Sequence, residues 1–157
     1  MSVELRAIQP EDQAFLQRVY ASTRKEELAP VPWTDAQKSE FLWMQFRAQH
    51  AHYQQHYPGA RFSVIMENGT PVGRLYVHPR ADELRLVDIA LLPEARGRGT
   101  GRTLILEVLE EARARAVCVR IHVEQNNRAL GLYTRLGFRP VGENGIYLLL
   151  EWRPGLS

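Results

Sequence analysis

The stretch Pro93-Glu94-Ala95-Arg96-Gly97-Arg98-Gly99-Thr100-Gly101-Arg102 joins a strand-like segment to a helix-like one. The apolar pattern of residues 84–92 precedes it, and a helical pattern over 103–116 follows it. Three glycines at alternate positions remove the Cβ atoms that would keep a ligand from the backbone, and they tolerate a positive φ. A tight turn here directs unpaired N–H groups and the positive end of the helix dipole at one point. The stretch therefore predicts a loop that binds phosphate oxygens, with the neighbouring arginine side chains as additional donors.

The spacing of the glycines narrows the choice of phosphate ligand. Gly-x-Gly-x-Gly does not fit the dinucleotide fingerprint Gly-x-Gly-x-x-Gly, and the acidic residue expected about 20 positions later is missing. A nucleotide-triphosphate loop requires Gly-x-x-x-x-Gly-Lys-Ser/Thr, which is also absent. The stretch does match Arg/Gln-x-x-Gly-x-Gly/Ala through Arg96, Gly99 and Gly101. Taken alone, this pattern also fits an ordinary glycine-rich surface turn.

A second motif follows between residues 126 and 138. It has the form Asn-x-x-Ala, then Leu-Tyr, then Gly-Phe, and its residues are Asn126, Ala129, Leu132, Tyr133, Gly137 and Phe138. Two motifs in this order and separation, with a helix and a strand between them, resemble the GCN5-related N-acetyltransferase (GNAT) superfamily. Thr100 departs from the pattern, because an aliphatic residue is common at that position in the superfamily.

Hydrophobic periodicity predicts the remaining elements. Residues 3–7 have the pattern of a first strand, and a helix begins at Pro10. Thr34 to Gln37 has the form of a capping box for a second helix that ends near His56. Further strands are expected at 61–66 and 70–78 around an Asn-Gly turn, and at 83–92, 117–123, 139–141 and 146–152.

The resemblance implies an α/β (α+β) fold in a single N-acetyltransferase domain over residues 1–157. Its sheet would be mixed and mostly antiparallel, with six to seven strands and helices on both faces. Two central parallel strands, ending at Leu92 and Glu124, would splay apart, and the helix 103–116 would provide the crossover between them. Ligands gather where strand ends diverge, so the chemistry is expected between Leu91-Leu92 and Asn126.

The resemblance also implies that acetyl-coenzyme A is the co-substrate, and no metal is expected. Backbone groups of Leu91 would bond the pantetheine arm, and amides of the loop would hold the pyrophosphate. The implied cofactor-binding residues are Leu91, Leu92, Arg96, Gly97, Arg98, Gly99, Thr100, Gly101, Arg102, Asn126 and Tyr133. His52 and His56 are four apart on a helix, but no third metal ligand is evident nearby, so they are interpreted as a solvated helix face.

Two catalytic residues are hypothesised. Tyr133 would face the sulfur of the co-substrate, and as a phenol near pKa 10 beside a thiol near 8.5 it is best described as a hydrogen-bond donor to the departing thiolate. Packing under the sheet is its alternative role. Asp88 is the first hypothesis for the base that deprotonates the amine, because an acid in an apolar strand is unusual. A structural role as partner of an arginine explains Asp88 nearly as well, and Glu83, Glu26 and Glu27 are further candidates.

The function inferred from these residues is transfer of an acetyl group from acetyl-coenzyme A to a primary amine of a small molecule or protein, by direct attack in a ternary complex. A non-catalytic acyl-coenzyme A-binding regulatory module is the alternative. Residues 20–57, rich in aromatic and acidic side chains, are expected to wall the acceptor pocket.

The composition of the chain limits the classes of protein to which it can belong. The chain has 157 residues, 45% of them hydrophobic and 24% charged, which is typical of a soluble globular protein. No apolar run reaches the ~18 residues of a membrane span, and the N-terminus lacks a signal-peptide pattern. The single cysteine, Cys118, excludes an internal disulfide and favours the cytoplasm. A net charge of +2 without a wide basic stripe argues against nucleic-acid binding. The resemblance makes a homodimer an open alternative to a monomer, because members of the superfamily often form dimers.

Overall fold

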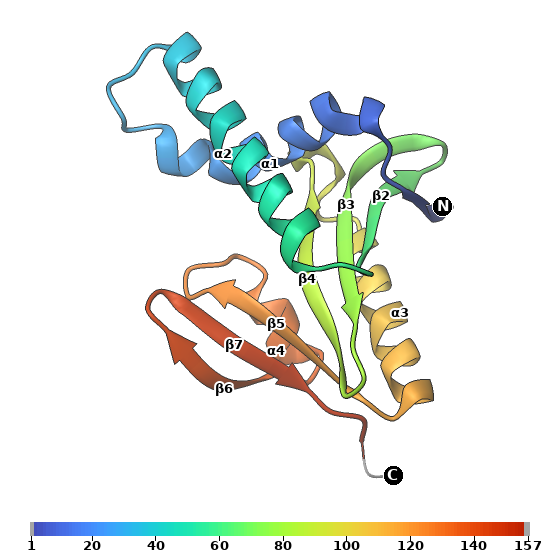
Figure 1. Ribbon diagram of the computed structural model, residues 1–157. Helices are drawn as coiled ribbons and strands as arrows, with labels where there is room; N and C mark the ends of the chain where they lie inside the picture. Colours follow the sequence, from blue (N-terminus) through green and yellow to red (C-terminus); the bar gives the residue numbers. More distant parts are fainter. Residues whose placement is uncertain (1, 156–157) are drawn as a thin grey trace.

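The computed structural model describes residues 2–155, which build one seven-stranded sheet with helices on both faces (Figure 1). The strands lie in the order β1-β2-β3-β4-β5-β7-β6. They are β1 (Val3–Ala7), β2 (Arg61–Glu67), β3 (Thr70–Pro79), β4 (Glu83–Leu91), β5 (Cys118–Glu124), β6 (Arg139–Asn144) and β7 (Tyr147–Trp152). The helices are α1 (Gln13–Leu28), α2 (Asp35–His56), α3 (Thr100–Arg115) and α4 (Leu130–Arg135), with 3-10 turns at Pro10–Asp12 and Pro93–Ala95.

In the described part of the chain, β4 and β5 alone are paired in parallel, and they are paired over a short stretch. Their register runs from Glu83 opposite Cys118 to Arg85 opposite Arg120, after which the two strands diverge. Every other neighbouring pair is antiparallel. The expected mixed sheet with a splay between its two central parallel strands is therefore confirmed, and α3 is the crossover that connects them.

Two apolar layers cover the two faces of the sheet. The inner face of α3 packs with α4 against one side, through a cluster that includes Leu104, Ile105 and Val108. On the other side, Leu16 and Tyr20 of α1 meet Phe46 of α2 in a second cluster. In Figure 1, α2 crosses in front of β3 and β4 but does not cross β5, β6 or β7. Within residues 2–155, one face of the β5–β7–β6 half of the sheet is thus left without a helix.

Local sequence signals explain where the elements begin and end. Thr34 caps α2, accepting from the backbone N–H of Gln37, and the expected capping box is confirmed. Asn68 and Gly69 both have positive φ, at 52° and 81°, as a two-residue hairpin turn requires. Gly137, at φ 100°, ends α4.

Some expected boundaries were wrong. The helix after the glycine loop begins at Thr100 rather than 103, because Gly99 adopts a left-handed conformation at its N-cap and the helix starts directly afterwards. The last two strands, β6 and β7, meet through a tight turn at 145–146, so β6 extends to Asn144 rather than 141 and β7 begins at Tyr147 rather than 146.

The aromatic residues of α2 differ in burial. Phe46 is buried, but Phe41 is only partly buried and packs edge-on against Trp33, which is itself 42% exposed. No helix within residues 2–155 is long and apolar enough to cross a bilayer.

Candidate active site

The gap between β4 and β5 is lined by free backbone groups of β4. The N–H of Leu92 donates to the carbonyl of Val72 on β3, at 2.8 Å. Because backbone groups of a strand alternate in direction, Ala90 also faces β3, whereas Ile89 and Leu91 direct their N–H and C=O groups towards the diverging side. Past Arg85, no strand pairs with that side of β4 within residues 2–155. The gap therefore offers hydrogen bonds to an extended amide-containing ligand.

The phosphate-loop prediction can be compared directly with the backbone. Gly97 and Gly99 have φ of 77° and 81°, a region that L side chains rarely adopt. Gly99 is the N-cap of α3 and has no side chain with which to satisfy the first-turn amides, and the first backbone bond of the helix runs from Thr103 to Gly99. The N–H groups of residues 100–102 are consequently available to a ligand. Arg102 lies in this first turn with an exposed side chain.

A buried carboxylate that the motif analysis did not single out braces this loop. Glu67, the last residue of β2, is 5% exposed and accepts a hydrogen bond from the hydroxyl of Thr100 at 3.1 Å. Its other oxygen pairs with Arg98 at 3.2 Å. The departure from the family pattern at Thr100 therefore has a physical reason, because an aliphatic residue there would leave Glu67 without this donor. Thr100 was the one sequence signal that pointed to such a partner.

Arg96 fixes the junction between β4 and the loop. Its Nε donates to the carbonyl oxygen of Leu91 at 3.0 Å, and its side chain is partly buried. This bond engages the Leu91 carbonyl, so the N–H of Leu91 is its remaining backbone group for a ligand. Arg96, Arg98 and Arg102 thus occupy three different environments, of which only that of Arg102 is an exposed helix turn.

Tyr133 and Asp88 lie near enough to interact electrostatically across the gap. Tyr133, on α4, is 2% exposed and packs edge-on against Phe138 at a centroid distance of 5.3 Å. Burial raises the pKa of its phenol, and the negative charge of Asp88 raises it further. The phenol is therefore neutral at ordinary pH and remains a hydrogen-bond donor.

Asp88 is held by a buried arginine on the neighbouring strand. Arg74 of β3 has a side chain that is only 3% exposed, and its Nη2 lies 2.5 Å from Oδ2 of Asp88. The hydroxyl of Tyr53 on α2 also donates to this oxygen, at 3.4 Å, while Gln49 accepts from the same arginine at 2.9 Å. The arginine-partner alternative considered for Asp88 thus has a direct observation behind it, and the carboxylate is engaged rather than free.

The other carboxylate candidates lie in two different places. Glu83 is at the closed end of the splay, 4% exposed and ion-paired to arginines, away from the diverging strand ends. Glu26 pairs with Arg128 at 2.8 Å, which links the end of α1 to the segment before α4. Glu124, a residue that the sequence did not single out, ends β5 and pairs with Arg24 of α1 at 3.2 Å. These two ion pairs place the end of α1 beside the open end of β5.

Asn126 lies two residues after the end of β5 and is exposed. The neighbouring Asn127, rather than Asn126, uses its side chain locally, accepting from the N–H of Ala129 at 2.7 Å. The side chain of Asn126 is not used for that turn. Cys118 is 5% exposed, and burial raises the pKa of its thiol, as expected for a buried small residue. The rings of His52 and His56 stack on each other at 4.2 Å.

Comparison with known proteins shows which family this chain belongs to. Residues 16–138 match the model of the acetyltransferase (GNAT) family. The chain belongs to the GNAT acetyltransferase family. A Bacillus subtilis (strain 168) protein provisionally named a ribosomal protein bS18-alanine N-acetyltransferase is 31% identical over 105 residues, covering 60% of this chain and 69% of its own length. The N-alpha-acetyltransferase RimI of Mycobacterium tuberculosis is 36% identical over 87 residues, covering 55% of this chain and 54% of its own length.

The fold of the GNAT chain also has solved counterparts. The PaiA N-acetyltransferase of Thermoplasma acidophilum, crystallised with coenzyme A, superposes with a TM-score of 0.73 at 20% identity, covering 98% of this chain and 99% of that one. GNAT proteins transfer an acetyl group from acetyl-coenzyme A to an amine, so this chain is an acetyl-coenzyme A-dependent N-acetyltransferase. The glycine loop, the free amides of α3 and the open edge of β4 fit coenzyme A as its co-substrate. Membership of an enzyme family also favours catalysis over the non-catalytic alternative.

Proposed function

We propose that this GNAT enzyme transfers the acetyl group directly from acetyl-coenzyme A to a primary amine while both are bound. The observation that carries the proposal is the splay, in which the free edge of β4, the strand of Asp88, leads from the amides at the start of α3 into the space between β4 and β5. The N–H groups of residues 100–102 would hold the diphosphate, and those of Ile89 and Leu91 would bond the pantetheine arm and the thioester carbonyl. Asn126 would contact the co-substrate at the opposite wall.

Tyr133 would stabilise the leaving thiolate. Its buried, neutral phenol can donate a hydrogen bond to sulfur as charge develops there. Proton transfer from the phenol need not be complete, because a thiol is the stronger acid of the two by about 1.5 pKa units. Tyr133 therefore acts in this proposal as a positioned donor, and its burial serves that role.

The engagement of Asp88 bears on which amine is the acceptor. A carboxylate already bonded to Arg74 and Tyr53 is a poor candidate for removing a proton from a strongly basic alkyl amine. Exposing the free form of an alkyl amine costs about 4–5 kcal/mol at pH 7, whereas a polypeptide α-amine near pKa 8 costs only about 1 kcal/mol. We therefore propose a polypeptide N-terminal α-amine as acceptor, deprotonated through Asp88 or through water. RimI of M. tuberculosis, named an N-alpha-acetyltransferase, is consistent with this choice.

The test is acetyl-coenzyme A turnover over a panel of amines. The panel contains short peptides with free α-amines, lysine-containing peptides whose N-terminal α-amine is blocked, and simple alkyl amines. The readout is release of the coenzyme A thiol. Transfer to the α-amine peptides, with mass spectrometry locating the acetyl group on the N-terminus, is the expected result. Transfer to blocked lysine peptides or alkyl amines alone would reject the α-amine acceptor. Binding of acetyl-coenzyme A without transfer to any amine would reject the catalytic proposal.

A further inference from the structure

Four arginines and two glutamates form one connected network on the sheet face that none of the described helices covers. Arg85 and Arg120 pair with Glu83 at 2.8 and 3.1 Å, and Arg80 lies 3.7 Å from the same carboxylate. Arg120 also pairs with Glu151 at 2.8 Å, and Arg153 completes the network through Glu151 at 2.6 Å. We call Arg80, Arg85, Arg120 and Arg153 the arginine face.

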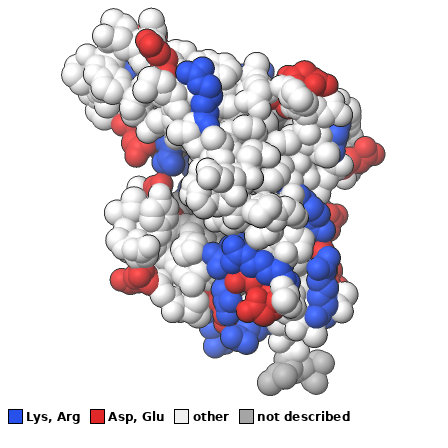
Figure 2. Space-filling view, in the orientation of Figure 1, with Lys and Arg blue, Asp and Glu red and all other residues white. Residues whose placement is uncertain are grey.

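The arginines of the network are more exposed than its glutamates. The side chains of Glu83 and Glu151 are 5% and 10% exposed, whereas those of Arg85, Arg120, Arg80 and Arg153 are 13%, 25%, 36% and 70% exposed. Four arginines against two glutamates leave a surplus of two positive charges, as large as the net charge of the whole chain. Figure 2 shows blue side chains gathered around red ones on this lower part of the molecule. The two additional positive charges therefore face solvent and are not needed to neutralise the two buried glutamates.

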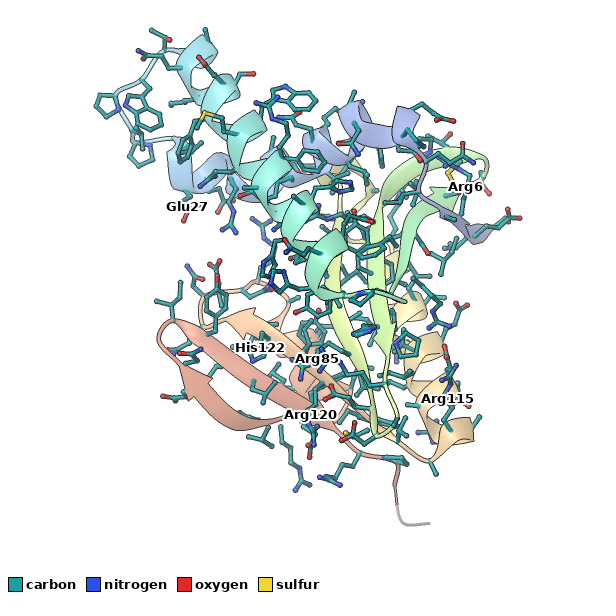
Figure 3. All side chains as sticks on the ribbon, in the orientation of Figure 1. Arg6, Glu27, Arg85, Arg115, Arg120 and His122 are labelled. Atoms are coloured by element: carbon teal, nitrogen blue, oxygen red, sulfur yellow. The ribbon has the colours of Figure 1, made fainter. Side chains whose placement is uncertain are left out.

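His122 connects the arginine face to the gap between β4 and β5. Arg85 and Arg120 are the last parallel pair before the strands diverge, and His122 follows two residues later on β5. Nη1 of Arg85 lies 3.0 Å from Nδ1 of His122, and the three labelled side chains share one face in Figure 3. A guanidinium cannot accept a hydrogen bond, so Nδ1 is the acceptor and Nε2 carries the proton. His122 therefore presents one more N–H donor beside the reaction gap.

A purely structural role accounts for only part of this network. Each buried glutamate requires one cation, and Arg85 and Arg120 already supply both. Arg80 and Arg153 are additional and are the more exposed pair, where an ion pair contributes little to folding. Like charges gathered on an open face repel one another unless a partner of opposite charge covers them.

The geometry points to the partner: we propose that the arginine face and His122 bind acidic side chains of a polypeptide acceptor, downstream of the amine that is acetylated. This inference rests on the proposed function and adds the acceptor's charge and form. The register pairs Arg120 with Glu151, so Arg153 lies about four residues along the sheet from His122, roughly 13 Å. That span matches about four residues of extended chain and exceeds the reach of a small amine with one carboxylate.

The experiment compares three peptides of equal length, each with N-terminal alanine followed by four residues that are Glu-rich, Gln-rich or Lys-rich. We expect kcat/KM to be about tenfold higher for the Glu-rich than for the Gln-rich peptide, lowest for the Lys-rich peptide, and the preference to decline with added salt. Arg153→Glu, at an exposed position, should reduce the preference about tenfold while KM for acetyl-coenzyme A stays unchanged. Arg115→Glu, on α3 at the opposite face, is the matched control and should preserve the preference.

The outcomes separate this inference from the proposed function. Equal use of the three peptides, or an Arg153→Glu enzyme with the wild-type preference, overturns the acidic acceptor and leaves acetyl transfer intact. Transfer to small amines but to no peptide also overturns it. Failure to acetylate any amine rejects the proposed function, and the acidic acceptor with it. An oligonucleotide that blocks acetylation while the peptides are used equally would reassign the arginine face to nucleic acid.

Discussion

Replacing Tyr133 by Phe removes one hydroxyl from the reaction gap and leaves the rest of the side chain in place. The ring is 2% exposed and would keep its contact with Phe138, so the free energy of unfolding should change by less than about 1 kcal/mol. Loss of a donor to a developing negative charge costs about 2.7–4 kcal/mol, which corresponds to a decrease in kcat of about 10²–10³-fold. KM for acetyl-coenzyme A should change little, because the bond forms mainly in the transition state.

The assay is steady-state release of coenzyme A with the best amine of the panel, from pH 6 to 9. Because burial and the charge of Asp88 raise the pKa of Tyr133, the wild-type profile should contain no ionisation from its phenol in this range. Tyr57→Phe, at the C-cap of α2, is the control and should retain wild-type kcat. A Tyr133→Phe enzyme that is folded and within about threefold of wild-type kcat would refute the donor role and favour packing as the function of this tyrosine.

Three further predictions concern the scaffold of the site. Gly73→Ala places a Cβ in steric conflict with the carbonyl oxygen of Ala90, so β4 must shift. Urea unfolding should show a loss of stability of about 2 kcal/mol or more, and an unchanged midpoint would contradict this close approach. Thr100→Val removes the hydroxyl that donates to Glu67; calorimetric unfolding should show a loss of about 1–3 kcal/mol and kinetics a raised KM for acetyl-coenzyme A at unchanged kcat, whereas a wild-type KM would mean that the brace does not position the loop. Burial alone would raise the pKa of Glu83, but hydrogen bonds and charges from its arginine partners outweigh burial and hold this pKa below its usual range. The ion pairs of Glu83 therefore contribute stability that is complete above pH 4.5 and is lost as pH falls through the lower pKa of the folded state. Glu83→Gln should lower the stability at pH 7 and reduce the loss of stability between pH 4.5 and more acidic pH. A Glu83→Gln protein that loses stability in acid as steeply as the wild-type chain would count against this.

Much of the fold was predictable because local chemistry determined it. Alternating apolar residues indicated the strands, the Asn-Gly pair indicated the hairpin, and the Thr34 capping box located the start of α2. The error at the start of α3 arose because one residue acts in two ways. Gly99 belongs to the loop by composition but is the N-cap of α3 by conformation, so the helix begins inside the motif.

The candidate site was predictable only where backbone geometry defines it. The glycine pattern predicted the positive φ values and the helix N-terminus that follows. Side-chain partners that come from distant segments had no such signal, apart from the departure from the family pattern at Thr100. Glu67 lies 33 positions before Thr100, and Arg74 lies 14 before Asp88, so tertiary pairing alone brings each pair together. The sequence offered Arg98 as a phosphate ligand, whereas the fold gives it a carboxylate partner in Glu67.

The central claim is that the N–H groups at the start of α3 hold the diphosphate of coenzyme A. The most direct test is calorimetric titration of coenzyme A into the wild-type chain, Gly99→Asp and Gly59→Asp. Gly99 and Gly59 have nearly equal φ, 81° and 86°, and no atom lies within 4 Å of a Cβ added at either, so the two variants add the same charge at similar backbone strain. The account predicts binding by the wild-type chain and Gly59→Asp, and binding at least about 30-fold weaker in Gly99→Asp, because its carboxylate faces the phosphates. Equal affinity in all three, or no binding by the wild-type chain, would contradict it.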